Sequence, residues 1–320
     1  MNENFSSHLS TDMKEFLRFK RALGYKYIRS AATLLSFDRF VAQCSRTGAD
    51  GSLESLIYNW LARIEGRKPF TISSDLAVVR QFCLFLRRKD PRAFVPSHDW
   101  ISEPKTTQFR PYIFSRKEVL ALLESTNSLR GSRFRALSIR TLLLVLYCTG
   151  LRFGEALRLR PDDVDVDNRV LRIRETKGKA RFVPIRDDLC RELRKYVGER
   201  NRVAKRNPQT SFFVRTNGQS YSISAASYTV RFLLRRIGLK PAKGRSGPRP
   251  YDLRHTFAVH RLTQWYRSGV DIHSRLPLLS AYMGHENILG TEDYLTATPD
   301  LLAIAGRRFE SRFRRTPKRK

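Results

Sequence analysis

Hydrophobic periodicity runs through most of this chain, but it fails between residues 90 and 111. Proline removes a backbone donor and disfavours a helix in the residue before it, and four prolines fall in this stretch: Pro91, Pro96, Pro104 and Pro111. A chain of 320 residues can hold two domains of the usual ~100–200 residues. We therefore predict a domain over residues 1–95, an extended linker over 96–111, a second domain over 112–311 and a basic tail over 312–320.

The first domain is predicted to be a small helical bundle. Thr11 or Asp12 is a suitable N-cap for a helix that runs to Leu23, and Gly24 is a suitable stop. Apolar residues at spacings of three and four predict three further helices, over residues 28–43, 56–64 and 72–89. The lysines and arginines of such a bundle fit either a DNA-binding face or ordinary solvated side chains.

The second domain is predicted to be mainly helical with a short antiparallel sheet. Ser115 and Glu118 have the spacing of a capping box, and a later helix over 134–148 stops at Gly150. Alternating β-branched residues predict three strands, over residues 164–166, 169–174 and 180–185. Helical patterns then return over residues 187–199, 222–238, 252–266, 276–283 and 299–309. The fold class is therefore mainly α with a small antiparallel β-sheet.

The charge of the chain indicates a polyanionic partner. Lys and Arg number 61 against 30 Asp and Glu, which gives a formal net charge of +31 spread along the whole length. Hydrophobic residues make up 41% of the chain, so it is expected to fold compactly, unlike a disordered basic tail. The longest apolar run, over residues 142–148, is far shorter than the ~20 residues that span a bilayer. We expect a cytoplasmic protein with no membrane partner.

Two arginines, a histidine and a tyrosine stand out in the order in which they occur. Arg152 follows Thr149-Gly150-Leu151, Arg254 opens Arg254-His255-Thr256, and Gly284-His285 is followed nine positions later by Tyr294. Guanidinium groups match phosphate oxygens in bidentate geometry, and a phenol can serve as a nucleophile. In a strongly basic chain this combination indicates attack on a phosphodiester, and DNA is the expected substrate.

These residues resemble the catalytic pattern of the tyrosine recombinase (phage integrase) family. The resemblance runs from near Ile113 to Thr298, and its matched positions are Arg152, Lys177, Tyr251, Arg254, His285 and Tyr294. Lys177 matches the lysine of a β-hairpin turn, with Lys179 as the alternative. Tyr251 departs from the pattern, because the family usually has histidine three residues before the second arginine. A phenol can still donate a hydrogen bond to phosphate, but it is no acid or base near neutral pH.

The resemblance implies both an activity and an assembly. It implies that the first domain grips DNA, and that Tyr294 cuts and rejoins DNA through a 3′-phosphotyrosyl intermediate without a metal or cofactor. It further implies a homotetramer on two double-stranded DNA sites, alone or with other recombinases. The function expected from it is that of a site-specific recombinase or integrase, with a mobile-element enzyme preferred among its biological roles.

Two other functions compete with this interpretation. The acidic stretch over residues 162–167 could place Asp163, Asp165 and Asp167 on one face of a strand, as in a metal-dependent transposase or nuclease with paired carboxylates. A catalytically idle DNA-binding accessory protein of the same fold is the other alternative. Glu155 lies three residues after Arg152, where it can form an ion pair with it, and is interpreted as structural.

Overall fold

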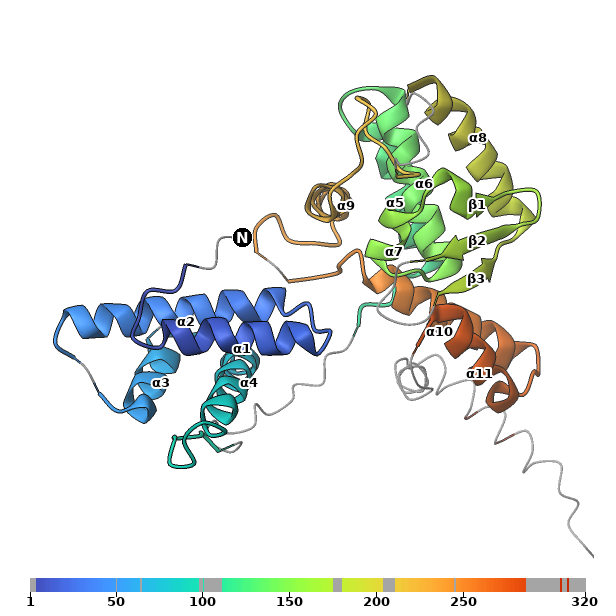
Figure 1. Ribbon diagram of the computed structural model, residues 1–320. Helices are drawn as coiled ribbons and strands as arrows, with labels where there is room; N and C mark the ends of the chain where they lie inside the picture. The colour runs from blue at the N-terminus through green and yellow to red at the C-terminus, as the bar shows by residue number, and fades with distance from the viewer. Residues whose placement is uncertain are drawn as a thin grey trace, which may run out of the picture. The chain divides into compact units, whose positions relative to one another are not determined.

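The computed structural model describes residues 4–49, 51–63, 65–97, 100, 111–174, 180–203, 211–244, 246–285, 306 and 310. The chain divides into two compact units, Met1–Phe109 and Arg110–Lys320 (Figure 1). This division falls inside the segment 96–111 that the sequence analysis interprets as a linker. The assignment of the first unit to DNA binding and of the second to catalysis stays a prediction.

The first unit is a bundle of four helices: α1 (Ser10–Ala22), α2 (Ile28–Arg46), α3 (Leu53–Ala62) and α4 (Pro69–Leu86). Each helix presents an apolar stripe, and the stripes meet in a core that includes the fully buried Phe16, Phe37, Trp60 and Phe82. Aromatic rings contact one another edge to face there, for example Phe37 and Trp60 at a centroid distance of 5.2 Å. The predicted helical bundle is therefore present.

The predicted start of the first helix is wrong. Helix α1 begins at Ser10, ahead of the caps expected at Thr11 or Asp12. The carboxylate of Asp38, in α2, accepts hydrogen bonds from the backbone N–H of Ser7 at 3.0 Å and from its hydroxyl at 2.6 Å. This contact fixes the chain just before α1. The start of the helix is therefore determined by a residue 31 positions away and not by a side-chain cap of its own.

Helix α4 is, by length and composition alone, apolar enough to cross a membrane. In this unit it contacts α1, α2 and α3, and its residues Leu76, Val79 and Phe82 lie in the core. Only 22% of this apolar window is buried, so α4 presents one face to the core of the first unit.

The second unit is built around α6 (Arg133–Thr149), which contacts α5 (Arg116–Ser125), α7 (Phe153–Arg158), α8 (Asp187–Val203) and α10 (Asp252–Arg267). The capping box predicted at the start of α5 is confirmed: Ser115 Oγ accepts from the Glu118 N–H at 3.2 Å, and the Glu118 carboxylate accepts from the Ser115 N–H at 2.7 Å. Two further helices in the described part of this unit are α9 (Ile223–Arg236) and α11 (Ile272–Met283). Helix α11 begins four residues before its predicted start at 276 and contains Pro277 in its first turns.

A three-stranded antiparallel sheet lies between α7 and α8 in sequence, in the order β1 (Val164–Asp165), β2 (Val170–Ile173) and β3 (Arg181–Pro184). Leu171 of β2 pairs with Val183 of β3, and both side chains are buried. The predicted small antiparallel sheet is thus confirmed, with shorter strands. Strand β3 also contacts α11, which brings the end of this sheet to the C-terminal part of the described chain (Figure 1).

Candidate active site

The site begins at a glycine turn between α6 and α7. Gly150 ends α6 in the left-handed conformation, with φ of 63°. A Cβ at this position would lie 2.4 Å from Cδ1 of Phe257 in α10, so glycine is required both for its φ and for the close packing of the two helices. Arg152, two residues later, is the N-cap of α7. Its side chain therefore starts from the point where α6 and α7 meet.

Arg152 is held by a carboxylate of its own helix and by a distant carbonyl. Its Nη1 donates to Glu155 Oε1 at 2.8 Å, and its backbone N–H donates to Glu155 Oε2 at 3.0 Å. Its Nη2 donates to the carbonyl of Gly284, 132 residues later, at 2.9 Å. Glu155 is buried, and its predicted ion pair with Arg152 is confirmed.

Arg254 approaches the same place from α10. It lies in the first turn of the helix, as predicted, and only 1% of the residue is exposed. Its Nη1 donates to the carbonyl of Gly150 at 2.7 Å, and its Nη2 donates to the carbonyl of Met283 at 2.9 Å. One guanidinium thus joins the turn after α6 to the end of α11, which fixes its own position.

A third arginine, Arg181 at the start of β3, completes the group. Its Nε donates to the carbonyl of Tyr282 at 2.9 Å, and its Nη2 donates to Glu155 Oε2 at 3.0 Å. The carbonyls of Tyr282, Met283 and Gly284 are therefore each bonded to a different arginine. Carbonyls at a helix C-terminus lack intrahelical donors and carry partial negative charge, which favours cations there.

His285 follows directly and is placed by a Schellman motif. Gly284 has φ of 68°, its N–H donates to the Ala281 carbonyl at 3.1 Å, and the His285 N–H donates to the Ser280 carbonyl at 3.0 Å. Partial burial and, after it, the positive charges of Arg254, Arg152 and Arg181 together lower the pKa of His285 to about 4. The imidazole is therefore neutral at pH 7 when no phosphate is bound.

Tyr251 lies at the start of α10 but does not join the arginine group. It is 41% exposed, and its ring contacts that of His255 edge to face at 5.0 Å. Burial lowers the pKa of His255, so this imidazole also favours its neutral form. The structure thus places Tyr251, which departs from the family pattern, next to His255 and on the helix turn that carries Arg254.

Two of the predicted catalytic positions, Lys177 and Tyr294, lie outside the described residues, as do Lys179, the basic tail and all but residue 306 of the predicted helix over 299–309. Another tyrosine, Tyr282, lies near the arginines. Its hydroxyl donates to the Pro184 carbonyl at 3.0 Å, and burial raises its pKa to about 12. A phenol so occupied and so weakly acidic is poorly suited to act as a nucleophile.

The acidic stretch does not form the single face that its alternation suggested. Asp163 lies in a 3-10 turn, is buried and pairs with Arg174, whereas Asp167 is exposed and lies 3.2 Å from Arg194. Asp165 accepts from the side chain and backbone N–H of Asn168, both at 2.8 Å. The strand is only two residues long, so alternation does not extend across the stretch. Within the described residues no three His, Cys, Asp or Glu side chains are grouped as metal ligands would be.

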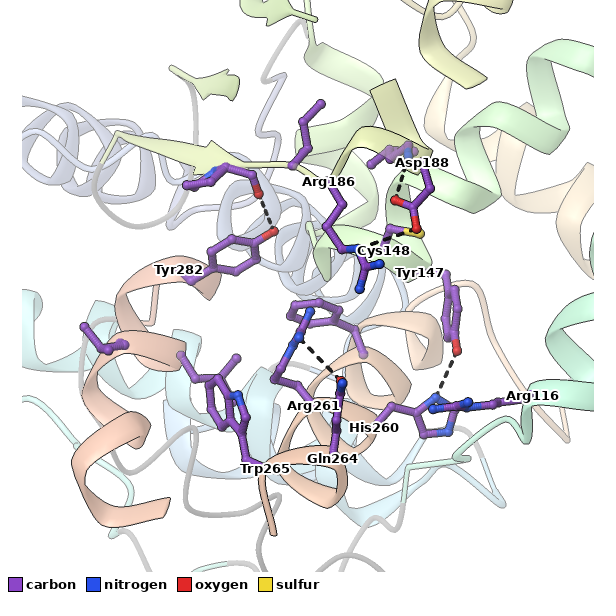
Figure 2. A pocket seen from close by; sticks show the side chains of 16 residues that line it. Arg116, Tyr147, Cys148, Arg186, Asp188, His260, Arg261, Gln264, Trp265 and Tyr282 are labelled. Carbon is purple, nitrogen blue, oxygen red and sulfur yellow. Dashed lines mark hydrogen bonds and ion pairs between the residues drawn. The ribbon is translucent and has the colours of Figure 1, made fainter. Parts of the chain in front are cut away.

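A cavity of about 420 Å³ lies next to the end of α11. Its apolar lining includes Phe257, Trp265 and Leu279, and Tyr282 forms part of its wall. Figure 2 shows charged side chains, among them Arg186 and Arg261, around these apolar residues. Arg152, Arg254 and His285 are not among the lining residues, so the cavity is distinct from the arginine group.

The arginine group can bind an anion from fixed positions. Its guanidinium groups come from α7, β3 and α10 and are oriented by hydrogen bonds before any ligand arrives. The neutral His285 beside them can accept a proton or a hydrogen bond. Arg152, Arg254 and His285 were predicted from the sequence, whereas Arg181 was missed. Arg181 lies two residues before the buried Val183, on the same face of the strand, and an arginine that points towards a core needs a charged or polar partner.

Comparisons with known proteins agree with this geometry. The profile of the phage integrase family matches residues 113–300. The putative integrase/recombinase y4rB of Sinorhizobium fredii is 32% identical over 308 residues, which cover 94% of this chain and 96% of the relative. The tyrosine recombinase XerA of Thermococcus kodakarensis is 31% identical over 206 residues, which cover 64% and 65% of the two chains.

Two solved structures share the fold. One is the XerH site-specific recombinase bound to its palindromic difH substrate, with a TM-score of 0.65 and 18% identity over 88% of this chain and 78% of that one. The other is the Tn1549 transposon integrase in complex with transposon right end DNA, with a TM-score of 0.65 and 18% identity over 93% and 99%. With the family profile and the full-length relative, these results show that the chain belongs to the phage integrase family and is a tyrosine-type DNA recombinase.

Proposed function

We propose that this recombinase cuts and rejoins DNA by transesterification at Tyr294. The Tyr294 oxygen bonds to the phosphorus as the bond to the 5′ oxygen breaks, which leaves a 3′-phosphotyrosyl ester and a free 5′-hydroxyl. The phenolic proton passes to a base, and the leaving oxygen takes a proton from Lys177. A 5′-hydroxyl from a second strand then reverses the reaction, so no nucleotide is hydrolysed and the phosphodiester energy is kept.

The observation that carries this proposal is the convergence of Arg152 and Arg254. They are separated by about a hundred positions in sequence, yet they donate to adjacent carbonyls, those of Gly284 and Met283, next to His285. Two guanidinium groups so placed can neutralise the non-bridging oxygens of one phosphate, whose charge grows in the transition state. The neutral His285 can take the Tyr294 proton or bond to the phosphate, and the Tyr251 hydroxyl can donate a further hydrogen bond.

The test is covalent capture. Purified protein is mixed with a pool of random-sequence duplexes that carry a nick, so that a short strand diffuses away after cleavage and traps the covalent complex. Adducts are isolated after denaturation, and the captured duplex then serves as substrate. Wild type should form an adduct at Tyr294. Tyr294→Phe, which removes only the phenolic oxygen, should bind the captured duplex normally and form none. If the wild type itself captures no DNA while binding it, the accessory-protein interpretation is favoured.

We infer that the enzyme serves a mobile element. Support comes from the relative named integrase/recombinase, which aligns over nearly the whole chain, and from the fold shared with a transposon integrase. Such an enzyme acts in the cytoplasm, on DNA sites that flank its own gene. Sequencing around the gene tests this inference: flanking repeats or attachment sites are expected, and a solitary gene far from any such boundary would contradict it.

We further infer that four protomers assemble on two duplexes through the C-terminal segment. Leu301, Leu302, Ile304 and Phe309 have the spacing of an apolar helix face in the sequence. The cavity beside α11, lined by Phe257, Trp265 and Leu279, offers an apolar receptacle for such side chains from a neighbour. A chain that ends at residue 300 should bind a single site like the full chain and fail to pair two sites. Unchanged pairing in native gels or light scattering would contradict the exchange.

A further inference from the structure

Arg181 joins three parts of the second unit that are distant in sequence. Its Nε donates to the carbonyl of Tyr282 at 2.9 Å, while Nη2 and Nη1 lie 3.0 and 3.4 Å from the two oxygens of Glu155. Its side chain is almost fully buried, with 9% exposed. The planar guanidinium therefore bridges β3, the start of α7 and the end of α11, and has little access to DNA.

The end of α11 is shaped around this guanidinium. A Cβ on Gly284 would lie 2.5 Å from Nη1 and 2.6 Å from Cζ of Arg181, so only glycine lets the arginine lie against the turn. The hydroxyl of Tyr282 also donates to the Pro184 carbonyl, so the first and last residues of β3 both hold Tyr282. Strand β3 is thus bonded to Tyr282 and packed against Gly284, the residue that precedes His285.

Arg181 also orients the carboxylate that holds Arg152. Glu155 Oε2 accepts from the backbone N–H of Arg152 and from Nη2 of Arg181, while Oε1 accepts from Nη1 of Arg152. Loss of Arg181 would remove one hydrogen bond from each oxygen of this buried carboxylate and so hold it less firmly. The guanidinium of Arg152 and the turn that carries His285 would then each lose a contact that fixes their position.

We propose that Arg181 is a positioning residue for the transesterification: it sets the places of Arg152 and His285 through Glu155 and the Tyr282 carbonyl, without contacting DNA. This role rests on the proposed function of that site. A displacement of about 1 Å in a reacting group can cost on the order of 10² in rate, so a residue of this kind affects the chemical step more than binding.

The charge of Arg181 gives the proposal a second, independent readout. Among the described residues, the groups whose positive charge lowers the pKa of His285 are Arg254 of α10, Arg152 of α7 and Arg181 of β3; His255 acts in the same direction when it is protonated. Each of these positive charges disfavours protonation of the imidazole. Removal of the charge at Arg181 should therefore raise the pKa of His285 and move the acid limb of the cleavage profile to higher pH. Loss of packing would also raise this pKa, because burial is its largest cause, so Arg181→Lys, which keeps the charge, separates the two effects.

The experiment compares Arg181→Met, Arg181→Lys and the control Arg172→Met. Arg172 lies on the neighbouring strand β2, opposite Phe182, is exposed and carries the same charge. Single-turnover cleavage of the duplex captured by the wild type is followed from pH 3.5 to 8, with DNA affinity and thermal unfolding measured alongside. Arg181→Met should cleave roughly 10²-fold more slowly with unchanged affinity, and its acid limb should move up. Arg181→Lys should keep the wild-type acid limb and recover part of the rate, since an ammonium cannot bond to both partners as a fork does.

The outcomes separate this inference from the proposed function. Failure of the wild type to form an adduct would overturn the function itself. Adduct formation at equal rates by wild type and Arg181→Met would overturn the positioning role alone. That role is likewise overturned if Arg172→Met slows cleavage as much as Arg181→Met, or if Arg181→Met loses affinity in proportion to rate. If Arg181→Met does not fold, Arg181→Lys decides: a wild-type rate in that variant would show that the fork geometry is not needed.

Discussion

Replacement of Glu155 by glutamine provides a quantitative test of the buried charge arrangement. Glu155 and Arg152 form an ion pair at i and i+3 with an N–O distance of 2.8 Å, and the carboxylate side chain is fully buried. Glu155→Gln keeps the volume but leaves two guanidinium groups, those of Arg152 and Arg181, without their common anion. Removal of one partner of a buried pair typically costs about 3–5 kcal/mol, because the remaining charge stays desolvated.

The chain contains a matched control for this substitution. Glu199 and Arg202 form another ion pair at i and i+3, also at 2.8 Å, but 48% of the Glu199 side chain is exposed. Glu199→Gln makes the same change in charge and shape, and an exposed pair contributes only about 0–1 kcal/mol. The N–O distance and the sequence spacing are equal in the two pairs, so the expected difference comes from the burial of Glu155 and from its second arginine, Arg181.

Hydrogen exchange of the amides in α6 and α10 measures the free energy of unfolding within the relevant unit, which avoids assuming that the two units unfold together. With a tenfold change for each 1.4 kcal/mol, the ~3–5 kcal/mol expected for Glu155→Gln should lower protection by roughly 10²-fold to about 4 × 10³-fold. Glu199→Gln should lower it less than about tenfold. Equal losses in the two variants would refute the reasoning, because they would show that burial of Glu155 adds nothing to the cost of removing its charge.

Three further predictions follow from the same contacts. In urea unfolding, Gly150→Ala should lower the free energy of unfolding by about 1–3 kcal/mol more than Gly238→Ala. Both glycines have positive φ, but only a methyl group at position 150 would overlap Phe257. Equal effects of the two substitutions would contradict this reasoning. The imidazole of His285 should titrate near pH 4 in NMR of the DNA-free protein. Because folding lowers its pKa, its contribution to the free energy of unfolding is present above pH 6.5 and is lost as the pH falls towards 4. Titration near pH 6.5 would show that burial and the neighbouring arginines do not act on His285 as the structure indicates. Covalent cleavage should persist in excess EDTA, whereas loss that magnesium restores would favour metal-dependent chemistry.

Much of the fold was predictable because its determinants are local. The capping box at Ser115 and Glu118 marks the start of α5, and Gly150 marks the end of α6. Alternating apolar residues located all three strands of the small sheet. Each of these signals depends on residues within a few positions of one another, so the sequence alone expresses them. The start of α1 was mispredicted because Asp38, far away in sequence, holds the chain ahead of it.

The candidate site was only partly predictable for the same physical reason. Arg152, Arg254 and His285 could be recognised by their order, and the structure brings them together. Their hydrogen bonds to the end of α11 could not be foreseen, because backbone carbonyls leave no trace in the sequence. Arg181 was overlooked because the pattern of a strand shows that a buried arginine needs a partner without showing which carboxylate provides it.

The place of the site in the fold raises a question of charge. A helix C-terminus carries about half a negative charge and would repel a phosphate if it stood alone. Here the carbonyls of Tyr282, Met283 and Gly284 do not face a phosphate, because each accepts a hydrogen bond from one of three arginines and holds it in place. Glu155 and the helix end together offset about one and a half of the three positive charges, so the arginines can converge before DNA arrives. The charge that remains is sufficient to attract one phosphate, and its donors are already oriented, which is the condition under which electrostatic stabilisation of a transition state is most effective.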